Sequence, residues 1–135
     1  MICSPQLSWG VRWQQILAMT QDQVAALVER EIANYRYQSV PGLVGDPLSH
    51  ERVTRELTEL RSCLVAPRQT TVQVESYTGE PLRTSDAWVV AEGADGTVVV
   101  YEPTSQDFWL VEGQEREGFR TFGVNGDLVG TFMAR

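Results

Sequence analysis

Two turn dipeptides, Asp95-Gly96 and Asn125-Gly126, most constrain the fold of this chain. Both tolerate the positive φ that a tight hairpin turn requires, and short apolar runs flank them, so the neighbouring strands should pair antiparallel. Between about 70 and 133 the pattern predicts five or six short strands in quick succession. The second half of the chain is therefore expected to form an antiparallel β-meander.

Two amphipathic helices are expected before this sheet, over about 21–36 and 50–64. In each of them apolar residues recur at spacings of three and four, which is typical of a helix with one buried face. Thr20 and Gln23 form a capping-box pattern, and Ser49 is a typical N-cap. The predicted fold class is α+β, with the two N-terminal helices packed on the C-terminal sheet.

The length of 135 residues suits one folding unit, because a chain of this size buries roughly two thirds of its unfolded surface. Residues 20–135 are expected to form a single α+β domain. Residues 1–19 have two readings. Trp9 and Trp13 lie at helical spacing and favour a short helix, whereas the cap that follows Met19 also fits an extension before the folded body.

The predicted strands are apolar on both faces. In Trp88-Val89-Val90 and in similar later runs, apolar side chains occupy successive positions, which point to opposite sides of a sheet. Two helices can cover one side. The other side must be covered by the N-terminal segment, by curling of the sheet or by another molecule, and pairing of two copies of the chain is one such arrangement.

The net charge of −7 belongs entirely to the predicted sheet. From residue 69 to the end, four arginines stand against eleven carboxylates, while the first half is neutral. The electrostatic field of this negative charge repels phosphate backbones and attracts a basic protein. Nucleic-acid binding is therefore disfavoured. The alternative is that the carboxylates simply keep the sheet soluble and its edges unpaired.

Two groups of residues are candidate contacts with a partner protein. Aromatic residues on three adjacent strands form either core or an exposed patch, and a glycine-flanked turn carries three glutamates that are either solvated or in contact with a cationic partner. The candidates are Trp88, Tyr101, Trp109, Glu112, Glu115 and Glu117.

Several chemistries are not indicated. The chain has no lysine, one histidine without a nucleophile placed beside it, and two cysteines far apart, so no catalytic residue, metal site or cofactor is predicted. Glycines 93 and 96 lie in a hairpin rather than before a helix, which argues against a phosphate-binding loop. No apolar run approaches the ~18 residues of a membrane span, and we expect a cytoplasmic protein.

These observations favour a small acidic protein-binding module without catalytic activity, acting on a basic partner. Small inhibitors such as bacterial immunity proteins, and dedicated chaperones, have this general build, although no residue motif ties the chain to either. The alternative is a small-molecule-binding protein or enzyme with a pocket between helices and sheet, in which Arg83 or Arg120 pairs with an anionic ligand.

Overall fold

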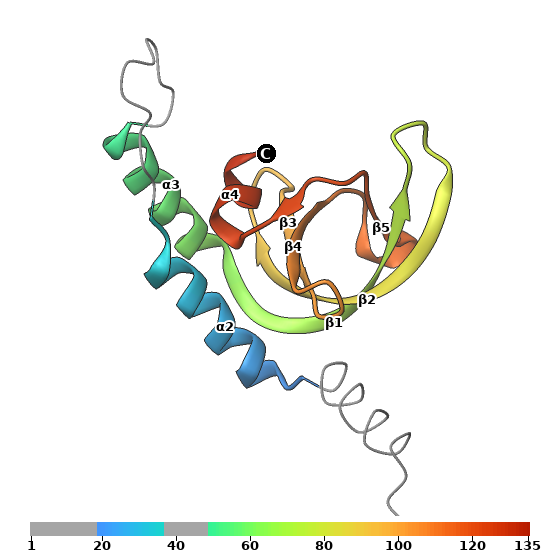
Figure 1. Cartoon of the computed structure of the whole chain (residues 1–135), viewed down its shortest axis with the longest axis horizontal. Helices are drawn as coiled ribbons and strands as arrows, with labels where there is room; N and C mark the ends of the chain where they lie inside the picture. Colours follow the sequence, from blue (N-terminus) through green and yellow to red (C-terminus); the bar gives the residue numbers. More distant parts are fainter. Residues whose placement is uncertain (1–18, 37–48) are drawn as a thin grey trace, which may run out of the picture.

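The computed structural model describes residues 19–36 and 49–135. It confirms the α+β fold class: two helices precede a six-stranded, mostly antiparallel sheet that curls on itself (Figure 1). The prediction about residues 1–18 lies outside the described residues. In chain order the elements are α2 (Gln21–Asn34), α3 (His50–Cys63), β1 (Leu64–Glu75), β2 (Pro81–Glu92), β3 (Val98–Glu102), β4 (Asp107–Val111), the 3-10 turn η1 (Glu115–Glu117), β5 (Phe119–Thr121), β6 (Asn125–Gly126) and α4 (Leu128–Met133).

Both predicted helices begin at the predicted caps. Thr20 accepts a hydrogen bond from the Gln23 backbone N–H, and the Gln23 side chain accepts one from the Thr20 N–H, which completes the capping box. Ser49 caps α3 by accepting from the backbone N–H of Arg52. The α2 helix buries Val24, Val28 and Ile32, one residue per turn, against the sheet.

The sheet has the order β5-β1-β2-β3-β4-β6. Consecutive strands from β1 to β4 pair antiparallel, as expected for a meander. The β5 strand instead pairs parallel with β1, and on its other side Arg120 and Glu112 exchange backbone hydrogen bonds of 2.9 and 3.0 Å. Strand β5 therefore bridges β1 and the residue that directly follows β4. Through this bridge, strands β1 to β5 close around a common interior.

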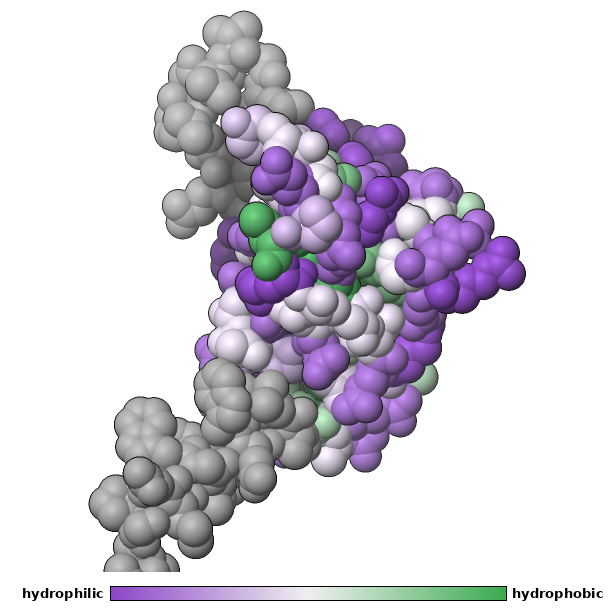
Figure 2. All heavy atoms as spheres, turned by 90° about the vertical axis from the view of Figure 1, so that its right-hand side faces the viewer, coloured by the Kyte–Doolittle hydropathy of each residue, from purple (hydrophilic) through white to green (hydrophobic). Residues whose placement is uncertain are grey.

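The closed sheet explains why its strands are apolar on both faces. Alternate side chains of the strands fill the interior, in a cluster made of Val72, Ala87, Val89, Val100, Trp109, Val111 and Phe119. The intervening side chains, including Trp88, Val90 and Tyr101, pack outward against α2, α3 and α4. Of the three ways in which the second face might be covered, curling of the sheet is the one observed. The face of the molecule in Figure 2 is mostly hydrophilic, with only small hydrophobic spots.

The end of the chain differs from the prediction. The segment Leu128–Met133 is the helix α4 rather than a last strand, because the Asp127 carboxylate caps it by accepting from the Gly130 N–H at 3.0 Å. The dipeptide Asn125-Gly126 is the short strand β6 beside β4, and not a hairpin turn. The other predicted turn is correct, since Gly96 has φ +89° between β2 and β3.

The start of the sheet also differs. Strand β1 begins at Leu64, directly after α3, rather than near residue 70. Pro67 lies inside it, where the pairing with β2 shifts register between Leu64 and Arg68. A proline is tolerated at such an irregularity because no ladder hydrogen bond depends on its nitrogen.

Candidate functional site

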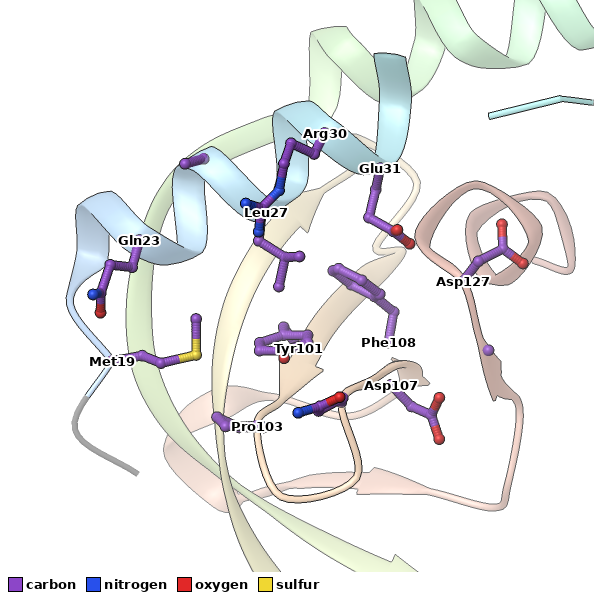
Figure 3. A pocket seen from close by; sticks show the side chains of 13 residues that line it. Met19, Gln23, Leu27, Arg30, Glu31, Tyr101, Pro103, Asp107, Phe108 and Asp127 are labelled. Carbon is purple, nitrogen blue, oxygen red and sulfur yellow. The ribbon is translucent and has the colours of Figure 1, made fainter. Parts of the chain in front are cut away.

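A groove of about 840 Å³ lies between α2 and the turn that joins β3 to β4. It is larger than two other pockets in the described ranges 19–36 and 49–135, which measure about 300 and 210 Å³. Figure 3 shows it from close by: α2 forms one wall, the β3–β4 turn the other, and the start of α4 closes one end. Its apolar lining consists of Met19, Ala26, Leu27, Tyr101, Pro103, Phe108 and Gly126, and its polar lining of Gln23, Arg30, Glu31, Gln106, Asp107 and Asp127.

The periodicity of α2 determines which of its residues reach the groove. The helix buries Val24, Val28 and Ile32 in the core. Leu27 and Glu31 each precede one of these buried residues by one position, so they lie at the edge of the buried face and line the groove. Gln23, Ala26 and Arg30 of the same helix line it as well. The groove wall is thus the margin of the buried face, where apolar and charged side chains meet.

Two aromatic rings form the floor. Tyr101 and Phe108 face each other across β3 and β4, with ring centroids 5.0 Å apart and planes inclined by 47°. Both residues are buried, and both line the groove. Their position is fixed by the ladder of two paired strands, so the floor is a rigid part of the fold.

The Tyr101 hydroxyl is the polar group of this floor. Only 5% of Tyr101 is exposed, and its hydroxyl makes no hydrogen bond with the described residues. Burial raises the pKa of Tyr101 above its ordinary value of 10.0, and the negative charges of Glu102, Glu31 and Asp107 raise it further, against an opposing effect of Arg30. The hydroxyl is therefore a neutral phenol near neutral pH, with one proton to donate and lone pairs to accept.

The β3–β4 turn positions two carboxylates opposite each other. Glu102 and Asp107 are directly paired across the two strands. The buried Glu102 carboxylate accepts hydrogen bonds from the Ser105 backbone N–H at 2.7 Å and from its hydroxyl at 3.3 Å. The Asp107 carboxylate accepts no hydrogen bond and joins no ion pair within the described part of the chain. Like charges directly opposite each other destabilise a sheet.

Gln106, in the same turn, has a backbone conformation that few side chains adopt. Its φ is +59°, the only positive φ outside glycine in the described residues. Its backbone N–H donates to the Glu102 carbonyl at 2.9 Å, which holds the turn in place. A left-handed residue with a long side chain is uncommon, and such positions are concentrated in functional turns.

The remaining two carboxylates of the groove accept hydrogen bonds from backbone N–H groups at the start of α4. Glu31 accepts a hydrogen bond from the Leu128 backbone N–H at 3.2 Å, and Asp127 caps the same helix. Asp127 also contributes to raising the pKa of the nearby Tyr35 phenol, after burial. These two carboxylates have structural partners, whereas Asp107 has none among the described residues.

The predicted aromatic patch does not form one surface. Trp88 and Tyr101 pack outward, toward the helices, while Trp109 belongs to the interior cluster. The guanidinium of the exposed Arg83 lies 5.6 Å from the Trp109 ring centroid. Trp88 is 7% exposed and Trp109 is 4% exposed. The condition for a partner contact, exposure of the patch, is not met; only Tyr101 lines the groove.

The predicted acidic turn is partly neutralised by its surroundings. Two nitrogens of the Arg68 guanidinium, Nη2 and Nε, donate to one carboxylate oxygen of Glu115, at 2.7 and 3.1 Å, and Arg68 also pairs with Glu92. This pairing lowers the pKa of the Glu115 carboxyl and raises that of the Arg68 guanidinium. Glu112 and Glu117 are exposed and lie outside the groove. As partner contacts, these three glutamates stay a prediction.

Other kinds of site find little support in the described residues. No group of three or more histidine, cysteine or acidic side chains there has the arrangement of a metal site. Arg83 and Arg120 do not line the groove. Within residues 19–36 and 49–135, no helix combines the length and the apolar character needed to cross a membrane.

Comparison with protein-family models, with curated proteins and with solved structures gave no match for this chain. The geometry of the groove is therefore the basis for any functional conclusion.

Proposed function

We propose that this chain is a protein-binding module whose groove between α2 and the β3–β4 turn receives a segment of a basic partner protein. The observation that carries the proposal is the composition of the groove: an apolar, partly aromatic floor bordered by three carboxylates and one arginine. An apolar centre with a polar border is typical of protein interfaces.

The charge of the whole chain supports the same class of partner. A net charge of −7 accelerates the approach of a basic protein and repels acidic ones. Because this effect is screened by salt, we expect complex formation to slow as the ionic strength rises. The apolar floor would keep part of the affinity at high salt, since burial of apolar surface does not depend on charge.

The proposed role is that of an inhibitor-like or chaperone-like protein. It acts by covering a segment of its partner and without catalysing a reaction. We place this activity in the cytoplasm, where the free thiol of the buried Cys63 would remain reduced.

A small-molecule ligand is the second candidate, and the groove volume favours it. About 840 Å³ lies within the range of roughly 300–1,000 Å³ that is common for ligand pockets. The ligand would not be held by Arg83 or Arg120, because neither lines the groove. Arg30 is the arginine available there. A protein partner that occupies the groove would argue against this candidate.

The proposal is tested by photo-crosslinking from inside the groove. A photoreactive amino acid replaces the exposed Ala26 on α2, and a matched control carries it at the exposed Glu59 on α3, which does not line the groove. We expect one basic protein to be crosslinked from position 26 and not from position 59. Crosslinking from neither position, or equally from both, contradicts the proposal; a product made of two copies of the chain would replace the foreign partner by a homodimer.

A further inference from the structure

We propose that the chain covers this groove with its own residues 1–18 in the free protein, and that Trp9 and Trp13 are the side chains that enter it. Residues 1–18 lie outside the described residues and join the described chain at Met19. A partner protein then has to displace this segment, a consequence that rests on the proposed function. The contact itself depends on no partner.

The chain enters the fold at the groove. Met19, the first described residue, lines the groove, and its partly buried side chain packs against the outer core cluster. In Figure 3 Met19 lies at one end of the groove and Asp127 at the other, with Leu27 and the rings of Tyr101 and Phe108 between them. The preceding residues are therefore attached at the edge of an apolar surface that the described chain leaves open.

The segment is long enough to cover the whole groove. The groove-lining residues of α2 run from Gln23 to Glu31, a rise of about 12 Å at ~1.5 Å per residue. The chain from Trp13 to Met19 spans up to about 20 Å when it is extended. Trp13, and Trp9 before it, can therefore reach any part of this wall without a movement of α2.

The apolar side chains of the segment match the floor of the groove. Residues 1–18 include Trp9, Trp13, Ile16 and Leu17, whose burial removes apolar surface from water. The floor offers two aromatic rings that are held in place by paired strands. Aromatic side chains pack favourably on one another in tilted or offset arrangements, so the tryptophans gain more than the burial of area alone.

The charges of the segment and the groove are complementary. Arg12 is the only charged side chain among residues 1–18. The groove is lined by three carboxylates and one arginine, and the whole chain carries a net charge of −7. A segment that combines apolar side chains with positive charge has the chemistry that we propose for the partner, so the two compete for one surface.

Covalent attachment favours the chain's own segment over a foreign one. A binding segment on a short flexible connection acts like a ligand at roughly millimolar concentration. A partner segment of similar chemistry therefore has to bind more tightly, or with further contacts, to replace it. The apparent affinity of the partner falls in proportion to the fraction of molecules in which the groove is open.

The experiment places a nitroxide spin label in the segment of the full chain. Ser8→Cys, in a Cys3→Ser background, provides a thiol beside Trp9, and Cys63 is not expected to react because it is buried. The label broadens the NMR signals of backbone amides that lie close to it.

We expect the broadening to be concentrated in the groove. The amide signals of Leu27 and Phe108 should be strongly broadened, and the signal of Gly79, in the turn between β1 and β2, should not be. Absence of broadening at Leu27 and Phe108 contradicts the proposal, as does equal broadening at all three positions.

Two pairs of substitutions separate binding from simple proximity to Met19. Trp9→Ser combined with Trp13→Ser removes the proposed anchors from the labelled chain and should reduce the broadening in the groove several-fold. Gln14→Ser combined with Gln15→Ser is the matched control, because it changes two residues of the same segment without removing an apolar side chain. Equal broadening in both double variants would mean that the tryptophans do not hold the segment in the groove.

A mixing experiment distinguishes the chain's own segment from that of a second copy. Spin-labelled chain without isotope enrichment is mixed with enriched chain that carries no label. We expect no broadening in the mixture, because each groove is covered by the segment of the same molecule. Broadening of groove signals in the mixture shows that the segment is exchanged between two copies, and it contradicts the proposal.

The contact and the proposed function can fail separately. Broadening in the groove without a partner crosslinked from position 26 leaves the contact in place and removes the protein-binding function. A crosslinked partner without broadening in the groove does the reverse. If both are observed, the tryptophan double variant should bind the partner more tightly than the glutamine control, about tenfold if the groove is open a tenth of the time. Equal affinity of these two variants contradicts the competition.

Discussion

The interior of the curled sheet and its helix-covered outer layer are built from the same strands, but the large groove lies at the outer layer. In the interior, Trp109 packs with six other apolar side chains, and the seven come from five strands. On the outside, α2, α3 and α4 cover the strands incompletely, and the groove remains beside Tyr101 and Phe108. A face closed by neighbouring strands is sealed by the hydrogen-bond ladders themselves, whereas a face covered by separate helices has margins at which a partner can bind.

The difference also concerns charge. Beside the interior cluster lie the Arg83 guanidinium, near Trp109, and the buried carboxylate Glu102. The outer layer ends in carboxylates at the β3–β4 turn and at the start of α4. We therefore assign stability to both buried clusters and binding to the margin of the outer layer. The predictions below test this division, from the largest expected effect to the smallest.

Trp109→Ala should cause the largest loss of stability. The side chain is 4% exposed, and truncation of a buried aromatic residue costs about 3–5 kcal/mol in free energy of unfolding. Chemical denaturation of the variant and the parent measures the loss. Leu82→Ala on the same sheet is the control, because Leu82 is 64% exposed and should change stability by less than about 0.5 kcal/mol. Similar losses for both variants would mean that the interior is not packed as described.

Leu60→Ala should loosen the outer layer more than the interior. Leu60 on α3 is fully buried in the outer cluster, so its truncation should cost about 2–5 kcal/mol. Amide hydrogen exchange should show that protection falls more in α2 and α3 than in β2 and β3. An equal fall in all four elements would show that the two layers unfold as one cooperative unit.

Thr20→Ala should destabilise α2, which forms one wall of the groove, without changing the packing of Tyr101 and Phe108 in its floor. The substitution removes one half of the capping box of α2, which is typically worth about 1 kcal/mol. Thr54→Ala is the control, because the Thr54 hydroxyl donates only to the His50 carbonyl within its own helix. Denaturation measures both; a loss for Thr54→Ala as large as for Thr20→Ala would rule out the capping explanation.

Glu115→Gln should have the smallest effect and should depend on pH. The Arg68 guanidinium lowers the folded pKa of Glu115 below its ordinary value of 4.5, so the ion pair stabilises the fold above that value. As the pH falls through the lowered folded pKa, this contribution is lost. Because the pair is exposed, we expect no more than about 1 kcal/mol between variant and parent near neutral pH, and a smaller difference in acid. Denaturation midpoints measured across this range check it; a difference that grows in acid would contradict the sign.

The local signals in the sequence predicted the helices well and the chain end poorly. Thr20 and Ser49 identify both helix starts, since capping depends on neighbours within one turn. The apolar segment after Asp127 fits a strand or a helix equally. Asp127 as an N-cap was the sequence signal that would have favoured the helix. The first strand was expected to begin near residue 70, and the tertiary pairing with β2 extends it back to Leu64, with Pro67 inside it.

The groove is harder to predict from sequence than the fold. Of its residues, Tyr101 was a candidate, as part of an aromatic patch that the pleat divides between two faces. Asp107 and Gln106 were not among the predicted site residues. Their place in the groove depends on the β3–β4 turn and its register, which pairs Asp107 with Glu102. Arg30 and the α2 wall depend on how the helix packs against β1, β2 and α4, which periodicity alone does not specify.

The most direct test of the central claim compares the groove with the acidic turn η1 as the site of partner binding. Tagged wild-type protein, Asp107→Asn and Glu117→Gln are used in parallel to capture the partner identified by crosslinking, at low and at high salt. The account predicts that Asp107→Asn recovers several-fold less partner while Glu117→Gln recovers as much as the wild type. Loss of the partner by Glu117→Gln, with full recovery by Asp107→Asn, would contradict it.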